Sequence, residues 1–181
     1  IAWEVDGRQY AWERPIATFN VSHTYIAQVR SWLPDQVGGV MWFSVDDPYT
    51  NCYVPMYVPM SDLPRPFTTG QRGAYTEDSL WWQFNVVSNY ANLMYSYMID
   101  EIQTVQRELE ADFLALQPAV EATAVELSRT EPELATRYLS NYSVTQSELV
   151  LRRWQELKRL LFRKYGDGYI ADEKGNVEEP G

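Results

Sequence analysis

The apolar positions of the chain follow two different periods. Up to about residue 60 they alternate with polar positions, as in β-strands, and beyond about residue 77 they recur every three or four residues, as in α-helices. Residues 61–76, between the two parts, are rich in Pro, Gly and Thr, and we expect them to form a connecting loop. The pattern therefore predicts an α+β fold in one structural unit, with a strand-rich part at 1–60.

Turn signals and alternation locate the individual strands. Asp6-Gly7 lies between two short apolar runs and suits a tight hairpin turn that needs positive φ, so residues 3–12 are predicted to form a hairpin. Further strands are predicted at 18–29, 40–45 and 52–58. Pro55 and Pro59 remove backbone donors from the last of these, which should therefore end there or lie at a sheet edge.

The helical part begins with a long apolar stripe. Its members fall three to four residues apart from Tyr90 to Phe113, on one face of a single long helix. This helix is expected to stop before Pro118. Pro118 and Pro132 each suit the first turn of a new helix, where the missing N–H costs nothing.

Capping signals suggest further helix boundaries. Two pairs of residues have the spacing of a capping box: Thr130 with Glu133, and Thr145 with Glu148. Gly166 follows a basic residue and a tyrosine and is a plausible helix stop. About four helices are therefore predicted within 77–166, followed by a polar tail at 167–181 that should lie on the surface or fray.

Length and charge limit the kinds of partner. The 181 residues can form one domain and bury roughly 70% of their unfolded surface. With 25 acidic against 15 basic residues, the net charge of −10 repels phosphate backbones and anionic lipid, so neither nucleic acid nor a membrane is an expected partner. A single cysteine makes neither an intrachain disulfide nor a four-ligand metal site, and no metal or cofactor is predicted. The compartment stays open, with the cytoplasm slightly favoured and a removed leader compatible with the start at Ile1.

Two adjacent acids, Asp46 and Asp47, end the apolar strand that carries Trp42. Neighbouring residues of an extended strand face opposite sides, so at most one of these acids can enter a given pocket. There it could bind the ammonium group of a peptide. The alternative is turn chemistry, which is favoured because Asp-Asp-Pro-Tyr is itself a good turn sequence.

Two arginines could bind the carboxylate of a peptide. Arg14 and Arg30 lie in or near the strands, and a guanidinium can hold a carboxylate through two parallel hydrogen bonds. The favoured alternative for each is a surface ion pair worth at most ~1 kcal/mol. Trp42 and Tyr53 could line an aromatic pocket, although seven tryptophans in one domain more often indicate core and interface. The candidate substrate-binding residues are Arg14, Arg30, Asp46 and Trp42.

The one histidine and the one cysteine could form a catalytic pair. His23 and Cys52 fall on different predicted strands, and a Cys/His pair that met in space could give an activated thiolate. The favoured alternative is that His23 points to solvent or makes a core hydrogen bond while Cys52 packs as a small apolar group.

Four motifs occur in order along the strand-rich part: RPIAT, QVRSWLPD, VGGVMWFSVDDP and YVPMY. Together with the later segment DSLWWQFNVVSNYANLMYSYMIDEIQTVQRELE, they make most of the chain resemble the dipeptidase family of N-terminal-nucleophile cysteine peptidases. The resemblance implies an αββα sandwich, in which two antiparallel sheets lie between helical layers. This chain would contribute late strands of that sandwich and a helical C-terminal part.

In that family the nucleophile is a cysteine at the mature N-terminus, and its own α-amino group acts as the base. Because Ile1 stands first here, the resemblance implies that no catalytic residue lies in this chain, that it is the C-terminal part of a dipeptide-hydrolysing peptidase, and that the isolated chain is inactive. Apolar strand faces exposed by such a division would favour a homo-oligomer. Two alternatives are a non-catalytic interaction module and, less favoured, a thiol enzyme using Cys52 and His23.

Overall fold

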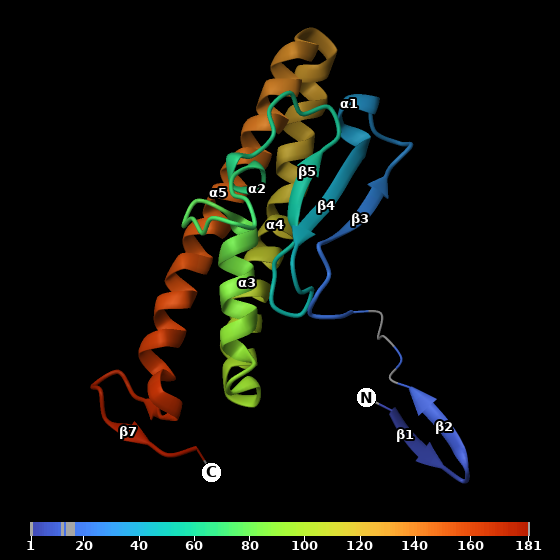
Figure 1. The fold of residues 1–181 in the computed structure, drawn as a ribbon. Helices are drawn as coiled ribbons and strands as arrows, with labels where there is room; N and C mark the ends of the chain where they lie inside the picture. The colour runs from blue at the N-terminus through green and yellow to red at the C-terminus, as the bar shows by residue number, and fades with distance from the viewer. Residues whose placement is uncertain (1, 12, 14–16, 181) are drawn as a thin grey trace.

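A three-stranded antiparallel sheet packs against long helices, with a small hairpin near each end of the chain (Figure 1). The structure is a computed structural model, and it describes residues 2–11, 13 and 17–180. The α+β class expected from the two apolar periods is confirmed.

The first hairpin pairs strands β1 (Ala2–Val5) and β2 (Arg8–Ala11). Asp6 and Gly7 form its turn with φ angles of 52° and 73°, as a two-residue turn of this kind requires. The hairpin expected at 3–12 is thus confirmed over its described residues. Every residue of both strands is exposed, and the hairpin stands away from the rest of the chain (Figure 1).

The central sheet has the order β3-β4-β5, with β4 in the middle. Its strands are β3 (His23–Val29), β4 (Gly39–Val45) and β5 (Val54–Tyr57). All three predicted strands exist, although the first begins later than residue 18. A single helical turn, α1 (Asp35–Gly38), joins β3 to β4. The edge position expected for the strand with Pro55 is confirmed, because β5 pairs with β4 alone in the sheet.

The two faces of this sheet have different surroundings. Along β4, Val40, Trp42 and Ser44 are buried on the face toward the helices, and the residues between them are half-buried on the other face. Directly paired residues point to the same side, so Tyr25 shares the second face with Phe43. That face is covered at one end, where Phe43 packs edge-on against Phe67 at 5.3 Å between ring centroids, and it is open along β3.

Helices α2 (Arg65–Thr68) and α3 (Leu80–Ala91) follow the sheet, and two much longer helices, α4 (Tyr95–Thr130) and α5 (Pro132–Lys164), complete the described part. The stretch predicted as a loop at 61–76 is irregular apart from α2 and one bridge between Gln71 and Ala74. A 3₁₀ turn (Gly166–Gly168) and the strand pair β6 (Ile170–Ala171) and β7 (Val177–Glu178) end the fold on the surface, as expected for the polar tail.

The single long helix expected from Tyr90 to Phe113 is wrong. The helix stops at Ala91, and the chain reverses through a short turn before α4 runs back beside α3 (Figure 1). Both helices still pack their share of the stripe, such as Tyr90 on α3 and Met98 on α4, against one core. An apolar stripe is therefore preserved across a turn, which is why its period does not reveal the break.

The stop expected at Pro118 is also wrong, because α4 continues through this residue to Thr130. Pro118 is exposed, so water can satisfy the carbonyl left without a partner, while Phe113 and Val120 on either side of it are buried. Packing against the core thus outweighs the cost of the proline. The described residues accordingly hold three helices longer than two turns in place of four.

The other helix signals had mixed outcomes. Pro132 in the first turn of α5 and Gly166 just beyond its last turn are confirmed. Neither capping box forms: Thr130 is the last residue of α4, and Thr145 lies inside α5. Glu131 is the single residue between α4 and α5 and takes the N-cap position of α5. Thr130 therefore does not cap α5.

The core joins the sheet to all three long helices. Among its largest buried side chains are Tyr57 of β5, Phe84 of α3, Phe113 of α4 and Trp154 of α5. The rings of Phe84 and Trp154 meet edge to face with centroids 5.0 Å apart, a preferred aromatic geometry. Over the residues that the structure describes, no helix combines the length and apolar character needed to cross a membrane.

Replacing Pro118 by alanine should stabilise the chain. Alanine restores the missing helical N–H and removes the clash of the ring with the preceding turn, so we expect the free energy of unfolding to rise by about 1–3 kcal/mol. Urea unfolding followed by circular dichroism measures this difference. A loss of stability would show instead that the core packs against a local shape of α4 that only the proline provides.

Candidate functional site

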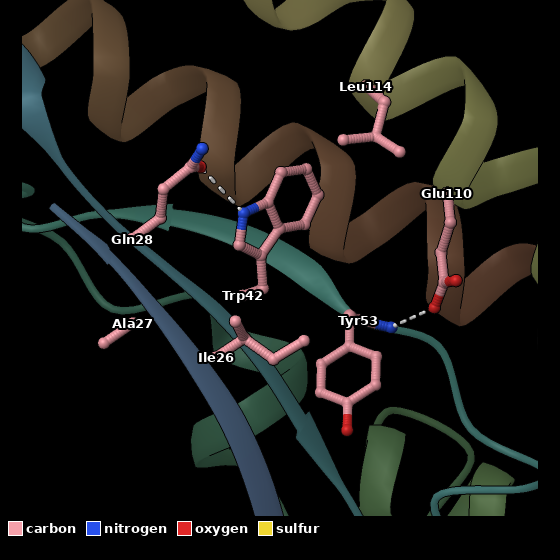
Figure 2. A pocket seen from close by; sticks show the side chains of 7 residues that line it. All are labelled: Ile26, Ala27, Gln28, Trp42, Tyr53, Glu110 and Leu114. Carbon is pink, nitrogen blue, oxygen red and sulfur yellow. Dashed lines mark hydrogen bonds between the residues drawn. The ribbon is translucent and has the colours of Figure 1, made fainter. Parts of the chain in front are cut away.

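A pocket of about 380 Å³ opens between the sheet and helix α4 (Figure 2). Its walls are Ile26 and Gln28 of β3, Trp42 of β4, Tyr53 just before β5, and Glu110 and Leu114 of α4. The pocket exists because Trp42 lies on the face of β4 that turns toward the helices, opposite Ile26 on the neighbouring strand. Trp42 and Tyr53, which the sequence suggested as parts of an aromatic pocket, are therefore brought together here.

Hydrogen bonds hold the walls of this pocket in place. The indole Nε1 of Trp42 donates to Oε1 of Gln28 at 3.2 Å, and Gln117 donates to the same oxygen at 3.3 Å. On the other side, the backbone N–H of Tyr53 donates to Oε1 of Glu110 at 2.9 Å. Figure 2 shows both of the bonds that involve Trp42 and Tyr53. The orientation of the indole and of the carboxylate is thus set by the chain itself.

Glu110 is the one charged side chain among the described residues that line the pocket. Burial raises the pKa of its carboxyl group, and the N–H of Tyr53 opposes this shift. A carboxylate in this setting is stabilised by any cation that enters the pocket.

Asp46 is buried at the end of β4 with an unusual backbone. Its φ is 64°, and the residue is only 3% exposed. Asn85 of α3 donates to Oδ1 at 3.0 Å, and Oδ2 is buried with no hydrogen-bond partner among the described residues. Burial raises the pKa of Asp46 to about 6, although the bond from Asn85 opposes the shift.

Asp47 has the turn role that the sequence favoured. Its Oδ1 accepts from the backbone N–H of Tyr49 at 3.0 Å, and its Oδ2 accepts from the hydroxyl of Ser88 at 3.1 Å. The prediction that the two acids face opposite sides is wrong, because both carboxylates contact α3, at Asn85 and Ser88. The positive φ of Asp46 ends the extended strand there, so strict alternation no longer applies.

Arg30 is neither exposed nor in a surface ion pair, and the sequence-based alternative is corrected. It is 7% exposed and forms a buried ion pair with Glu121 of α4. Its other nitrogens donate to the carbonyl oxygens of Val37 at 3.0 Å and Gly38 at 3.3 Å. The guanidinium is therefore engaged inside the fold in place of binding a substrate carboxylate. The other candidate, Arg14, lies outside the described residues.

His23 and Cys52 do not form an activated pair. Cys52 is fully buried, and burial raises the pKa of its thiol well above the usual value, with the charge of Glu110 adding to the effect. His23 is exposed, lies 3.1 Å from the hydroxyl of Ser22 through Nδ1, and stacks on Phe43. A protonated buried thiol is a poor nucleophile, so the packing role favoured from the sequence is the one that the structure supports.

Sequence reasoning missed Glu110 and Leu114. Both lie on the long helix, where a lone glutamate and a leucine resemble ordinary positions of an amphipathic helix. Their place in the pocket depends on a contact with Tyr53, 57 positions earlier in the chain, for which the sequence has no signal. Among the described residues, no group of three or more His, Cys, Asp or Glu side chains could hold a metal ion.

The fold and this site describe an α+β protein in which an antiparallel sheet and helices enclose a mostly apolar pocket with one carboxylate. Comparison with known proteins identifies its family. The model of peptidase family C69 matches residues 4–108, more than half of the chain. The chain belongs to peptidase family C69, and the resemblance to its dipeptidases that the motifs indicated is confirmed.

Curated relatives carry the same description. Probable dipeptidase B of Streptococcus pyogenes serotype M1 is 23% identical over 156 residues, which cover 83% of this chain and 30% of the relative. Probable dipeptidase B of Lactococcus lactis subsp. lactis is 26% identical over 104 residues, covering 58% of this chain and 22% of the relative. The chain thus spans less than a third of the length of these relatives.

Removing Glu121 should destabilise the fold strongly. Glu121→Ala leaves the buried Arg30 without its counter-charge, and we expect a loss of about 3–5 kcal/mol in the free energy of unfolding. Glu126→Ala, which breaks the exposed pair with Arg129, is the matched control on the same helix and should cost less than about 1 kcal/mol. Similar losses for the two variants in urea unfolding would contradict a structural role of the buried pair.

Asp46 should make stability depend on pH. Its carboxyl group has a pKa of about 6 in the folded chain against an ordinary 3.8, so the folded state holds the proton more tightly. The associated stability is fully present below about pH 4 and is lost as the pH rises toward about 6, by on the order of 2–3 kcal/mol. Asp46→Asn, which tolerates the positive φ, should remove this loss.

The measurement for Asp46 is urea unfolding at several pH values between about 4 and 7. Asp112→Asn, at an exposed position of α4, is the control for the change in net charge. If Asp46→Asn and Asp112→Asn shift the pH profile equally, the desolvated carboxyl group of Asp46 is not its source.

Proposed function

We propose that this chain is the C-terminal part of a peptidase that hydrolyses dipeptides with an N-terminal cysteine nucleophile that lies outside it. The observation that carries the proposal is the match of residues 4–108 to peptidase family C69, together with relatives described as probable dipeptidase B. The short share of those relatives that the chain covers is consistent with a part of a longer enzyme.

The chemistry follows from the resemblance to N-terminal-nucleophile peptidases. The thiol of the N-terminal cysteine attacks the peptide carbonyl while the free α-amino group accepts its proton, and donors around the carbonyl oxygen stabilise the oxyanion. Nucleophile and base are then one residue. The one cysteine of this chain, Cys52, is fully buried, and burial raises the pKa of its thiol, so it is unsuited to this role.

The contribution of this chain would be to substrate binding. Trp42 presents an aromatic wall in the pocket, and Asp46 keeps one buried oxygen without a partner in the described part. A free dipeptide carries an ammonium and a carboxylate close to the scissile bond. Trp42 is therefore our candidate for contact with its apolar side chain, Asp46 and Glu110 are the two candidates for its ammonium, and Arg14 stays a candidate for its carboxylate.

An αββα sandwich is the architecture that we propose for the complete enzyme. Helices cover one face of the central sheet here, while Tyr25 and Val29 of β3 are 61% and 82% exposed on the other. Antiparallel sheets commonly bury an apolar face against a second layer. A second sheet from the rest of the enzyme would fill that position.

The exposed face also fits the second candidate, a non-catalytic interaction module that forms homo-oligomers. The two candidates differ in what covers Tyr25 and Val29: another part of the same enzyme, or another copy of this chain. Sedimentation of the isolated chain and of its Val29→Lys variant measures their oligomeric state. A specific dimer formed through this face should dissociate in Val29→Lys.

The isolated chain should not hydrolyse dipeptides. A panel of dipeptides incubated with this polypeptide should release no free amino acids, because its one cysteine, Cys52, is buried and its thiol pKa is raised. A longer polypeptide of the same protein that begins with the N-terminal cysteine should be active, and replacement of that cysteine by alanine should abolish the activity.

Cys52→Ala is the matched control in the active polypeptide. It removes a buried thiol that takes no part in the proposed chemistry, so the rate of hydrolysis should stay within about twofold. Turnover by the isolated chain that Cys52→Ala abolishes would overturn the proposal in favour of a thiol enzyme.

A further inference from the structure

The pocket in Figure 2 combines apolar walls with one carboxylate. Its lining is mostly apolar and includes Trp42, Ile26 and Leu114, and none of its described lining residues is Lys, Arg or His. Pockets that bind small molecules are typically apolar with a few placed polar groups that select the ligand. The charge that selects the ligand is negative here.

Glu110 is positioned by the chain and still has bonding capacity. The backbone N–H of Tyr53 holds one carboxylate oxygen at 2.9 Å, and Glu110 makes no further hydrogen bond to any residue in the described ranges. A carboxylate can accept several hydrogen bonds on its two oxygens. Its second oxygen is therefore available to a donor in the pocket.

Trp42 gives the pocket a second feature that attracts a cation. Its N–H edge is bonded to Gln28, and although the residue is only 9% exposed, part of the indole lines the pocket, where Figure 2 shows it between Gln28 and Glu110. A cation over an indole face gains about 0.5–2 kcal/mol, more where water is excluded. The ring and the carboxylate thus favour the same ligand charge.

We propose that this pocket binds a primary ammonium group attached to an apolar or aromatic group. The ammonium donates to the free oxygen of Glu110, and the apolar part packs against Trp42, Ile26 and Leu114. A neutral apolar molecule would leave the carboxylate without a counter-charge, and an anion would be repelled by it. The N-terminal residue of a dipeptide with a large apolar side chain has this chemistry, and only this last step rests on the proposed dipeptidase function.

Two small molecules test the charge selection. Phenethylammonium has the proposed chemistry, and 2-phenylethanol is its neutral counterpart of similar size. The nuclear magnetic resonance signal of the Trp42 indole N–H, assigned by its loss in Trp42→Phe, reports binding at this site in the 181-residue chain. We expect phenethylammonium to bind about tenfold more tightly than 2-phenylethanol.

Glu110→Gln tests the carboxylate itself. Glutamine keeps an acceptor for the N–H of Tyr53 and removes the charge, so the preference for phenethylammonium should fall from about tenfold to less than about twofold. Asp112→Asn changes the net charge equally, at an exposed position two residues along α4, and should keep the preference. Unchanged dispersion of the other signals verifies that the variants are folded.

Three results would overturn the proposal: equal affinity for the two molecules, an undiminished preference in Glu110→Gln, or shifts centred on a different indole. Phe-Gly and its N-acetylated form then test the dipeptide step, and binding of Phe-Gly with loss on acetylation is the expected result. If phenethylammonium binds and Phe-Gly does not, the dipeptide assignment is overturned. Hydrolysis by the longer polypeptide is measured separately, so that a failure of the proposed function is recognised as such.

Discussion

The buried ion pair between Arg30 and Glu121 joins parts of the chain that lie 91 positions apart. On one side, Arg30 also donates to the carbonyl groups of Val37 and Gly38, so it fixes the connection between β3 and β4. On the other, Glu121 accepts from the hydroxyl of Tyr57 at 3.0 Å, which ties β5 to the same point of α4. Two buried charges need hydrogen-bond partners to offset their loss of hydration. The bonds around the Glu121 carboxylate thereby hold all three strands against α4.

The pocket depends on that arrangement. Gln117 donates to Glu121 at 2.8 Å and to Gln28 at 3.3 Å, and Gln28 in turn accepts from Trp42. A continuous set of hydrogen bonds thus runs from the ion pair to the indole that forms one wall of the pocket. Side chains that bind a ligand are most effective when their orientation is set in advance, and here the orientation comes from the same contacts that dock the sheet.

The sequence correctly predicted the structural features that a single residue or turn determines. Asp6-Gly7 gave the hairpin, Pro55 the edge position of β5, and Pro132 the start of α5, because each acts through the φ angle or N–H of the residue itself. Pro118 shows the limit of this reasoning. The cost of a proline inside a helix is also local, but burial of α4 on both sides of Pro118 stabilises the helix by more than this cost. The helix therefore continues through it.

The candidate site divides in the same way. The sequence by itself determined the α+β class and the family, through the order of its motifs, and it proposed Trp42 and Asp46 as candidate binding residues. Only the tertiary structure decided that Arg30 is buried in an ion pair, that both acids contact α3, and that Glu110 completes the pocket. Period and turn chemistry act over a few residues, whereas burial and charge pairing depend on which distant segments meet in the folded chain.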